Sequence, residues 1–138
     1  MSLSIRNQIA GTVTDVTTGE AMSTVKVRLD GGQDITAAIT TDAVKDLGLA
    51  VDSEVKALVK STEIALATGP VAGVSIRNQI AGTVSDIATG GAMASVKVDV
   101  AGGALTAAIT KDAVADLGLA TGSSVVALIK STEVSLSV

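Results

Sequence analysis

The sequence predicts a mainly β protein built from two tandem copies of a small five-stranded barrel, each with one short helix. Three observations support this fold class. The chain of 138 residues repeats itself once, apolar and polar residues alternate over short runs, and each copy holds one capped helical segment. Hydrophobic residues make up 47% of the chain, which is enough to form a globular core.

The repeat is long and sets the organisation of the chain. Segment 4–13 returns unchanged at 75–84, an offset of 71, whereas segment 60–63 returns at 130–133, an offset of 70. One residue is therefore missing from the second copy. The loss falls near Gly31-Gly32, where a surface hairpin loop would tolerate it.

The repeat divides the chain into two predicted domains. We place the first at 1–67 and the second at 74–138, joined by a linker at 68–73 that holds the only proline. Because the linker is short, the two halves must lie side by side or share strands.

Each copy contains five predicted strands. Val25, Val27 and Leu29 alternate with polar residues, as expected for a strand with one buried face. The segment 125–129 is continuously apolar, which predicts a strand buried on both faces. The other strands of the first copy are predicted at 9–16, 34–40, 55–60 and 63–66.

One helix is predicted in each copy. Thr40 or Thr41 serves as the N-cap, residues 42–47 form the helix, and Gly48 ends it. The second copy repeats the pattern over 110–118. Five short strands with one small helix indicate an OB-like barrel.

The composition excludes several classes of function. The chain has no Cys, His, Phe, Tyr or Trp, so thiolate and imidazole chemistry are excluded and no ring can stack on a base. With 10 basic and 14 acidic residues, its net charge of -4 disfavours a nucleic-acid-binding OB module. No constellation supports an enzyme. No apolar run is long enough for a membrane helix and no secretory signal is visible, so we expect no membrane partner and a cytoplasmic protein.

The small halves also predict self-association. Without aromatic residues each half buries little apolar surface, and neither disulfides nor zinc can compensate. We therefore expect a symmetric homo-oligomer. Met22 and Met93 are expected to fill space in the core.

Three repeated polar features bear on function: Ser-x-Arg-Asn opens each half, Ala-Ile-Thr precedes each helix, and Lys-Ser-Thr-Glu follows one strand. Together they supply cations, hydroxyls and nearby backbone amides, the donor set that a small oxyanion requires. Taken alone, each feature also has a structural explanation, as a strand-entry arginine or a solvated edge lysine. Lys26 and Lys97 lie mid-strand on the polar face and are expected to face solvent.

The opening Ser-Ile-Arg-Asn-Gln-Ile-Ala-Gly-Thr-Val resembles the Ser-Ala-Arg-Asn-x-x-x-Gly-x-Val signature of the Mop (TOBE-type) domain. Two such domains with nothing else are similar to the di-Mop molbindins. The resemblance implies OB-like barrels, a homotrimer, and oxyanions held at subunit and domain interfaces. It implies cytoplasmic molybdate storage or homeostasis, with tungstate as an analogue, no organic cofactor and no catalysis. The alternative is a stand-alone regulatory or interaction module, related to the TOBE domains of molybdate transporters and regulators.

The resemblance also implies the site residues, with no side chain bonded directly to the metal. The expected molybdate donors, which include the backbone amides of the two isoleucines, are Ser4, Ile5, Arg6, Thr40, Lys60 and Ser61, with Ser75, Ile76, Arg77, Thr110, Lys130 and Ser131 in the second copy. A second kind of site, near a symmetry axis, is expected at Gly19, Ala21, Met22, Gly90, Ala92 and Met93. The chain departs from the family in two ways. Ile5 and Ile76 stand where Ala is usual, and Ala43 and Ala113 stand where several members carry Ser, which removes a hydroxyl donor.

Overall fold

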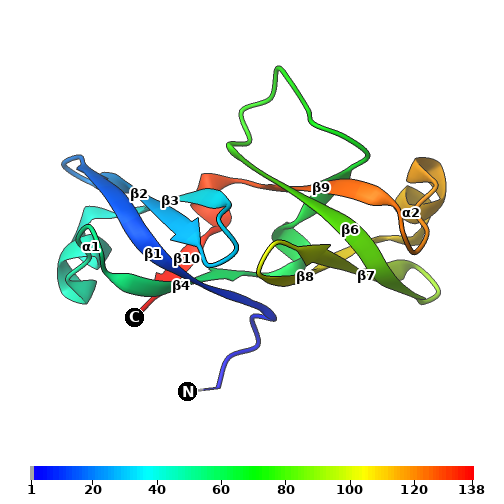
Figure 1. Ribbon diagram of the computed structural model, residues 1–138, viewed down its shortest axis with the longest axis horizontal. Helices are drawn as coiled ribbons and strands as arrows, with labels where there is room; N and C mark the ends of the chain where they lie inside the picture. The colour runs from blue at the N-terminus through cyan, green and yellow to red at the C-terminus, as the bar shows by residue number, and fades with distance from the viewer. Residues whose placement is uncertain (1) are drawn as a thin grey trace.

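The computed structural model describes residues 2–138 and shows two curled five-stranded sheets side by side (Figure 1). The mainly β, OB-like prediction is confirmed. Residue 1, where the first predicted domain begins, lies outside the described residues. The first half contains β1 (Asn7–Thr18), β2 (Met22–Leu29), β3 (Asp34–Thr40), α1 (Thr41–Leu47), β4 (Glu54–Val59), the 3-10 helix η1 (Ser61–Glu63) and β5 (Ala65–Ala67). The second contains β6 (Asn78–Thr89), β7 (Met93–Val100), β8 (Gly103–Thr110), α2 (Lys111–Leu117), β9 (Ser124–Ile129), η2 (Ser131–Glu133) and β10 (Ser135–Ser137).

The two halves exchange their last strands. The first sheet has the order β10-β4-β1-β2-β3 and the second β5-β9-β6-β7-β8. Ser135 pairs with Leu58 in the first sheet, and Ala65 pairs with Leu128 in the second. Figure 1 shows β10, in red, beside β4 of the first half. Each barrel is therefore completed by three residues of the other half, and the domain boundaries at 67 and 74 remain a prediction about the sequence repeat.

The core follows the predicted alternation. Val25, Val27 and Leu29 are buried while their neighbours in β2 are exposed. All five residues of 125–129 are buried, as expected for a strand covered on both faces. One continuous cluster of buried side chains includes Val59 from the first half and Ile129 from the second. The apolar interior therefore runs across the junction, the region where the two barrels meet.

The helices form as predicted, because their signals are local. The Thr40 hydroxyl accepts from the Ala43 N–H at 3.1 Å, and Gly48 ends α1 with a positive φ of 62°. The predicted strand at 63–66 is wrong at its start. Residues 61–63 form η1 instead, because the chain must turn away from β4 to reach the other barrel, and β5 begins only at residue 65.

The methionines are not core residues, contrary to expectation. Met22 is 49% exposed and Met93 is 48% exposed. Each lies at the start of a strand beside a hairpin tip, opposite Thr40 or Thr110 in the register. Buried and more exposed residues alternate along β2 and β7, and each methionine falls on the outer face of its strand, so its side chain does not enter the core.

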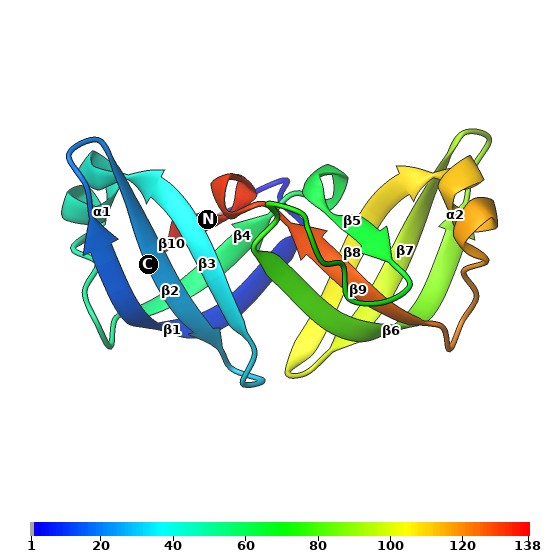
Figure 2. The ribbon, with the colours of Figure 1, turned by 90° about the horizontal axis from the view of Figure 1, so that it is seen from above.

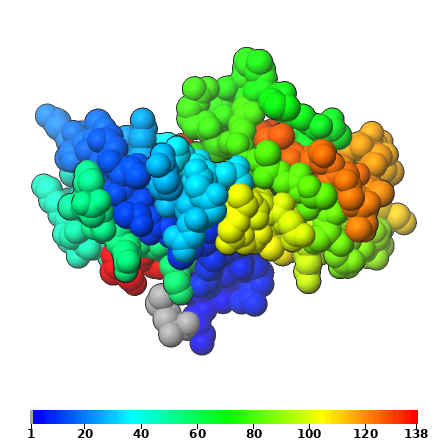
Figure 3. Space-filling model, viewed as in Figure 1, coloured from blue at the N-terminus to red at the C-terminus, as the bar shows by residue number. Residues whose placement is uncertain are grey.

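Two glycines mark where the hairpins of the two halves touch. A Cβ atom on Gly31 would collide with the carbonyl group of Ala101, and one on Gly102 would collide with the backbone of Gly31. Figure 2 shows the β2–β3 and β7–β8 loops meeting at the bottom of the molecule, and Figure 3 shows cyan and yellow atoms in contact there. Only glycine permits this approach of two backbones.

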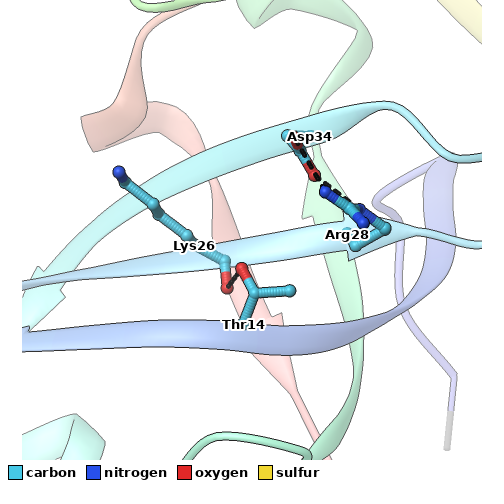
Figure 4. Close-up of polar contacts among 4 residues, drawn as sticks. All are labelled: Thr14, Lys26, Arg28 and Asp34. Carbon is cyan, nitrogen blue, oxygen red and sulfur yellow. Dashed lines mark hydrogen bonds and ion pairs between the residues drawn. The ribbon is translucent and has the colours of Figure 1, made fainter.

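A β-bulge bends β1. The pairing of β1 with β2 shifts between Val13 and Asp15, and the hydroxyl of the intervening Thr14 donates to the Lys26 carbonyl at 3.3 Å. In Figure 4 the Lys26 side chain points away from the neighbouring Arg28–Asp34 ion pair. Lys26 and its counterpart Lys97 are exposed, as predicted.

Candidate functional site

The two Lys-Ser-Thr-Glu segments lie near the middle of the molecule. Each follows the last residue of a central strand, β4 or β9, and turns into η1 or η2. η1 packs against β8 and η2 packs against β3, so each segment reaches the barrel of the other half. Figure 2 shows the green and red turns side by side at the junction.

Arg6 and Lys60 are neighbours across two paired strands. Asn7 pairs with Val59, so the residue before Asn7 and the residue after Val59 lie at the same end of the β1–β4 pair. Arg77 and Lys130 are related in the same way, because Asn78 pairs with Ile129. All four cations are exposed. The fold therefore brings together two of the predicted cations in each half.

The arginines also shape the segments that precede the strands. Arg6 donates to the carbonyl oxygens of Leu3 at 2.7 Å and Ser4 at 3.1 Å. Arg77 repeats both bonds, to Val74 at 2.9 Å and Ser75 at 3.2 Å. Each guanidinium carries five N–H donors, so several remain for a ligand.

The backbone amides of these segments are available as donors. Ile5 and Ile76 are half-buried, and within residues 2–138 no acceptor receives their N–H groups. Ser4 and Ser75 are exposed beside them. The segments thus offer an amide, a hydroxyl and a guanidinium within three consecutive residues.

Ser61 and Ser131 carry the most unusual polar atoms of the site. Their hydroxyl oxygens are shielded from solvent and have no hydrogen-bond partner among the residues that the structure describes. A buried hydroxyl without a partner costs about 1–3 kcal/mol. The same unmet hydroxyl occurs in both halves, which points to an acceptor that the protein itself does not supply.

Thr40 and Thr110 lie elsewhere in the chain. Each ends its strand and caps the helix that follows, and α1 and α2 lie at the two outer ends of the molecule (Figure 2). The capping bond uses a lone pair of the hydroxyl oxygen, so its O–H remains able to donate. In the part of the chain that is described, no hydrogen bond joins Thr40 to Arg6 or Lys60.

The second predicted site segment is the neighbour of Thr40. In the first half the Gly19 N–H donates to the Met22 carbonyl at 3.0 Å, and the Thr41 hydroxyl donates to the Gly19 carbonyl at 2.9 Å. The hairpin is thereby tied to the start of α1. In the second half Lys111 replaces Thr41, so this side-chain bond is specific to the first half.

The hairpin and the helix together expose large apolar side chains at the outer ends of the molecule. Met22 and Leu47 expose large side chains there, and Met93 repeats the pattern in the second half. Exposed apolar side chains gathered at one end are typical of a contact surface.

Sequence reasoning missed Asn7 and Asn78 as structural organisers of the site. Both are 3% exposed. Asn7 makes two hydrogen bonds with the backbone of Thr106 in β8, and Asn78 makes two with Thr36 in β3. A signal was available, since an uncharged polar residue directly follows the arginine in both copies.

Fold and site together define a binding module, in which two interlocked OB-like barrels gather cations and hydroxyls at their junction. The chain belongs to the TOBE domain family, whose model matches residues 3–66 and again residues 74–136. The tandem arrangement inferred from the repeat is therefore confirmed.

Known relatives of the chain are molybdenum proteins by name. It is 39% identical over 141 residues to the molybdenum transport protein ModE of Herbaspirillum seropedicae, and 39% identical over 135 residues to the molybdenum-pterin-binding protein MopB of Rhodobacter capsulatus. These alignments cover 100% and 96% of this chain but 52% and 50% of the relatives. The chain thus spans about half the length of the relatives it matches.

A solved structure matches the whole chain. The crystal structure of the cytoplasmic molybdate-binding protein ModG, with molybdate bound, superposes with a TM-score of 0.95 at 39% sequence identity. The match covers 100% of this chain and 99% of that one.

Both α-helices have only seven residues, and nothing within residues 2–138 forms a helix capable of crossing a membrane.

Proposed function

We propose that this chain binds molybdate in the cytoplasm, with tungstate as a close analogue, and serves in molybdenum storage or homeostasis. The observation that carries the proposal is the pair of buried, unpartnered hydroxyls of Ser61 and Ser131. Each serine directly follows a lysine, and that lysine neighbours an arginine across the paired strands. Two cations and an unpartnered hydroxyl therefore lie at the same end of each strand pair. Relatives named for molybdenum and a molybdate-bound structural match support this choice of anion.

Binding requires no chemistry on the anion. Molybdate keeps its four oxo ligands and only accepts hydrogen bonds, so the protein supplies donors and positive charge. Lys60 and Arg6 balance the charge, while Ser61, Ser4 and the Ile5 amide donate to the oxo groups. The second copy uses the equivalent residues, and neither an organic cofactor nor a catalytic group takes part.

The position of Thr40 leads us to propose a homotrimer. Thr40 lies at an outer end of the molecule and Lys60 near its middle, so a site that contains both needs a second protomer. The exposed Met22 and Leu47 supply apolar surface for that contact. The Gly19–Met22 and Gly90–Met93 segments would then face other protomers, where the second kind of anion site is expected near a symmetry axis.

Native mass spectrometry with and without molybdate tests this proposal in one measurement. The expected species is about three times the 13.5 kDa chain mass, with bound molybdate that sulfate does not displace at equal concentration. A stable monomer at micromolar concentration would remove every site built across protomers. Equal binding of sulfate would reduce the function to general anion binding.

A regulatory role is the second candidate, and the ModE match favours it, because the whole chain aligns with half of a longer protein. A storage protein releases its anion without a macromolecular partner. A regulatory module would instead bind a partner protein with an affinity that changes on adding molybdate, and titration of candidate partners with and without the anion separates the two roles.

A further inference from the structure

The first barrel contains a hollow of about 540 Å³ beside the segment that holds Ile5 and Arg6. Side chains from β1 and β4 and the end of β10 line it. Gln8 is one of the lining residues and is exposed, and its side-chain amide donates to the Ile5 carbonyl at 3.2 Å. Over the range 2–138, no backbone N–H donates to the side-chain oxygen Oε1 of Gln8.

The equivalent face of the second barrel is occupied. The linker passes over it, and the Gln79 side chain takes both backbone groups of Val71: the Val71 N–H donates to Gln79 Oε1 at 3.1 Å and Gln79 Nε2 donates to the Val71 carbonyl at 2.8 Å. Figure 3 shows the linker as a green ridge on the second half. Gln79 occupies the same place in the repeat as Gln8. The second copy therefore shows how a glutamine at this position bonds to an extended chain that lies beside it.

The two faces also differ in charge. The second barrel has the neutral residues Ala101, Ser124 and Val126 there, of which Val126 is buried and the other two are exposed. The open face has Asp30, Glu54 and Lys56 at the equivalent places, and all three are exposed. None of them forms an ion pair within the described part of the chain. The hollow is thus net acidic, and it favours a segment that brings a basic side chain.

We propose that this hollow docks an extended, basic peptide segment of a partner protein. Gln8 holds one backbone amide of that segment by the two hydrogen bonds that Gln79 makes with Val71. Asp30 and Glu54 select a cationic side chain on the same segment. The hollow therefore recognises the main chain of the segment through Gln8 and its charge through the two carboxylates.

The linker sequence supplies the probe. Two capped hexapeptides are compared, Lys-Gly-Pro-Val-Ala-Gly and Glu-Gly-Pro-Val-Ala-Gly, each titrated into the full chain while the side-chain amide signals are followed by nuclear magnetic resonance. The lysine peptide is expected to shift the Gln8 amide saturably and to leave the Gln79 amide unchanged. Gln8→Ala should weaken binding at least about fivefold, because two neutral hydrogen bonds are lost. Asp30→Asn with Glu54→Gln should remove the preference for lysine over glutamate.

Two results would overturn the proposal. The first is binding of either peptide with equal strength to the Gln8→Ala variant, or no shift at the Gln8 amide at all. The second is a shift of the Gln8 side-chain amide signal that grows with protein concentration when no peptide is present. That outcome would assign the hollow to another copy of this chain rather than to a partner.

Discussion

Asn7 of the first half and Thr106 of the second are joined by two hydrogen bonds, with Asn7 Nδ2 donating to the Thr106 carbonyl at 2.9 Å and Asn7 Oδ1 accepting from the Thr106 N–H at 2.7 Å. Asn78 and Thr36 repeat the arrangement with distances of 2.8 and 2.7 Å. The asparagine side-chain amide thereby makes the pair of hydrogen bonds that the backbone of a neighbouring strand would make. Because each asparagine directly follows an arginine of the proposed site, these bonds set where the cations lie relative to the other barrel.

Replacing Asn7 should destabilise the whole protein rather than one half. Asn7→Ala removes the partner of the half-buried Thr106 N–H and carbonyl, which costs about 2–4 kcal/mol in the free energy of unfolding. Urea denaturation measures this loss, and Arg28→Ala, which breaks an exposed ion pair, is the control. An Asn7→Ala protein as stable as the Arg28→Ala protein would mean that the bonds to β8 do not hold the barrels together.

Replacing Ser61 and Ser131 should change molybdate affinity and folding stability in different ways. Ser61→Ala with Ser131→Ala removes two buried hydroxyls that find no partner among residues 2–138, so stability without anion is expected to stay equal or to rise by up to about 2 kcal/mol. Molybdate affinity should fall, because two donors are lost. Thermal unfolding and isothermal titration report the two effects.

Ser23→Ala is the matched control for these serines. Ser23 is also buried, but its hydroxyl pairs with the Thr41 hydroxyl at 2.9 Å. Its loss should lower stability by about 1 kcal/mol and leave affinity unchanged. Destabilisation by the Ser61 and Ser131 changes, with unchanged affinity, would show that those hydroxyls serve folding and not the anion.

The lysines at the ends of β4 and β9 should control affinity. Lys60→Ala with Lys130→Ala removes a charge-assisted hydrogen bond from each site, worth about 1.5–3 kcal/mol, or about tenfold to a hundredfold in affinity. Arg6→Ala with Arg77→Ala should act similarly. Isothermal titration with molybdate measures both.

Lys26→Ala with Lys97→Ala keeps the same change of net charge and serves as the control for the lysine variants. Both side chains are exposed on the barrel surface. If this pair abolished binding while the Lys60 and Lys130 pair did not, the site would lie elsewhere on the molecule.

The contact between the two hairpins should not tolerate a side chain. Gly31→Ala places a methyl group against the Ala101 carbonyl, so the hairpins must separate, at a cost of about 1–3 kcal/mol. Gly69→Ala in the linker meets no atom within 4 Å and should be nearly neutral. Equal unfolding temperatures for the two variants would mean that the hairpins are not in contact in solution.

The exposed Arg28–Asp34 pair predicts a small acid effect. The hydrogen bond from Arg28 and its positive charge lower the pKa of Asp34. The contribution of the pair to stability is therefore present above the ordinary carboxyl range and is lost as pH falls through the lowered pKa of Asp34. Arg28→Gln should raise the pKa of Asp34 back toward its ordinary value, and titration of its carboxyl carbon by nuclear magnetic resonance detects the change. An unchanged pKa would mean that the pair does not persist in solution.

The sequence by itself determined the elements whose physics is local. Alternation at Val25 and Val27 predicts a strand with one buried face, and a threonine and a glycine eight positions apart delimit each seven-residue helix. The repeat predicted a tandem of OB-like barrels for the same reason, since each copy carries a full set of such signals. The cations of the candidate site were also visible in the sequence, although their role remains a prediction.

Only the tertiary structure decided how the two copies combine. Residues 65–67 and 135–137 each fit a short strand, and β4 and β9 have nearly equivalent edges, so no local preference distinguishes pairing within a half from pairing between halves. The exchange of these strands in turn made residues 61–63 a 3-10 helix and left the Ser61 hydroxyl buried with no hydrogen-bond partner in the described part of the chain. It also determined that Asn7 bonds to the other barrel. These features depend on contacts between residues about 60–100 positions apart, which the pattern within one copy does not encode.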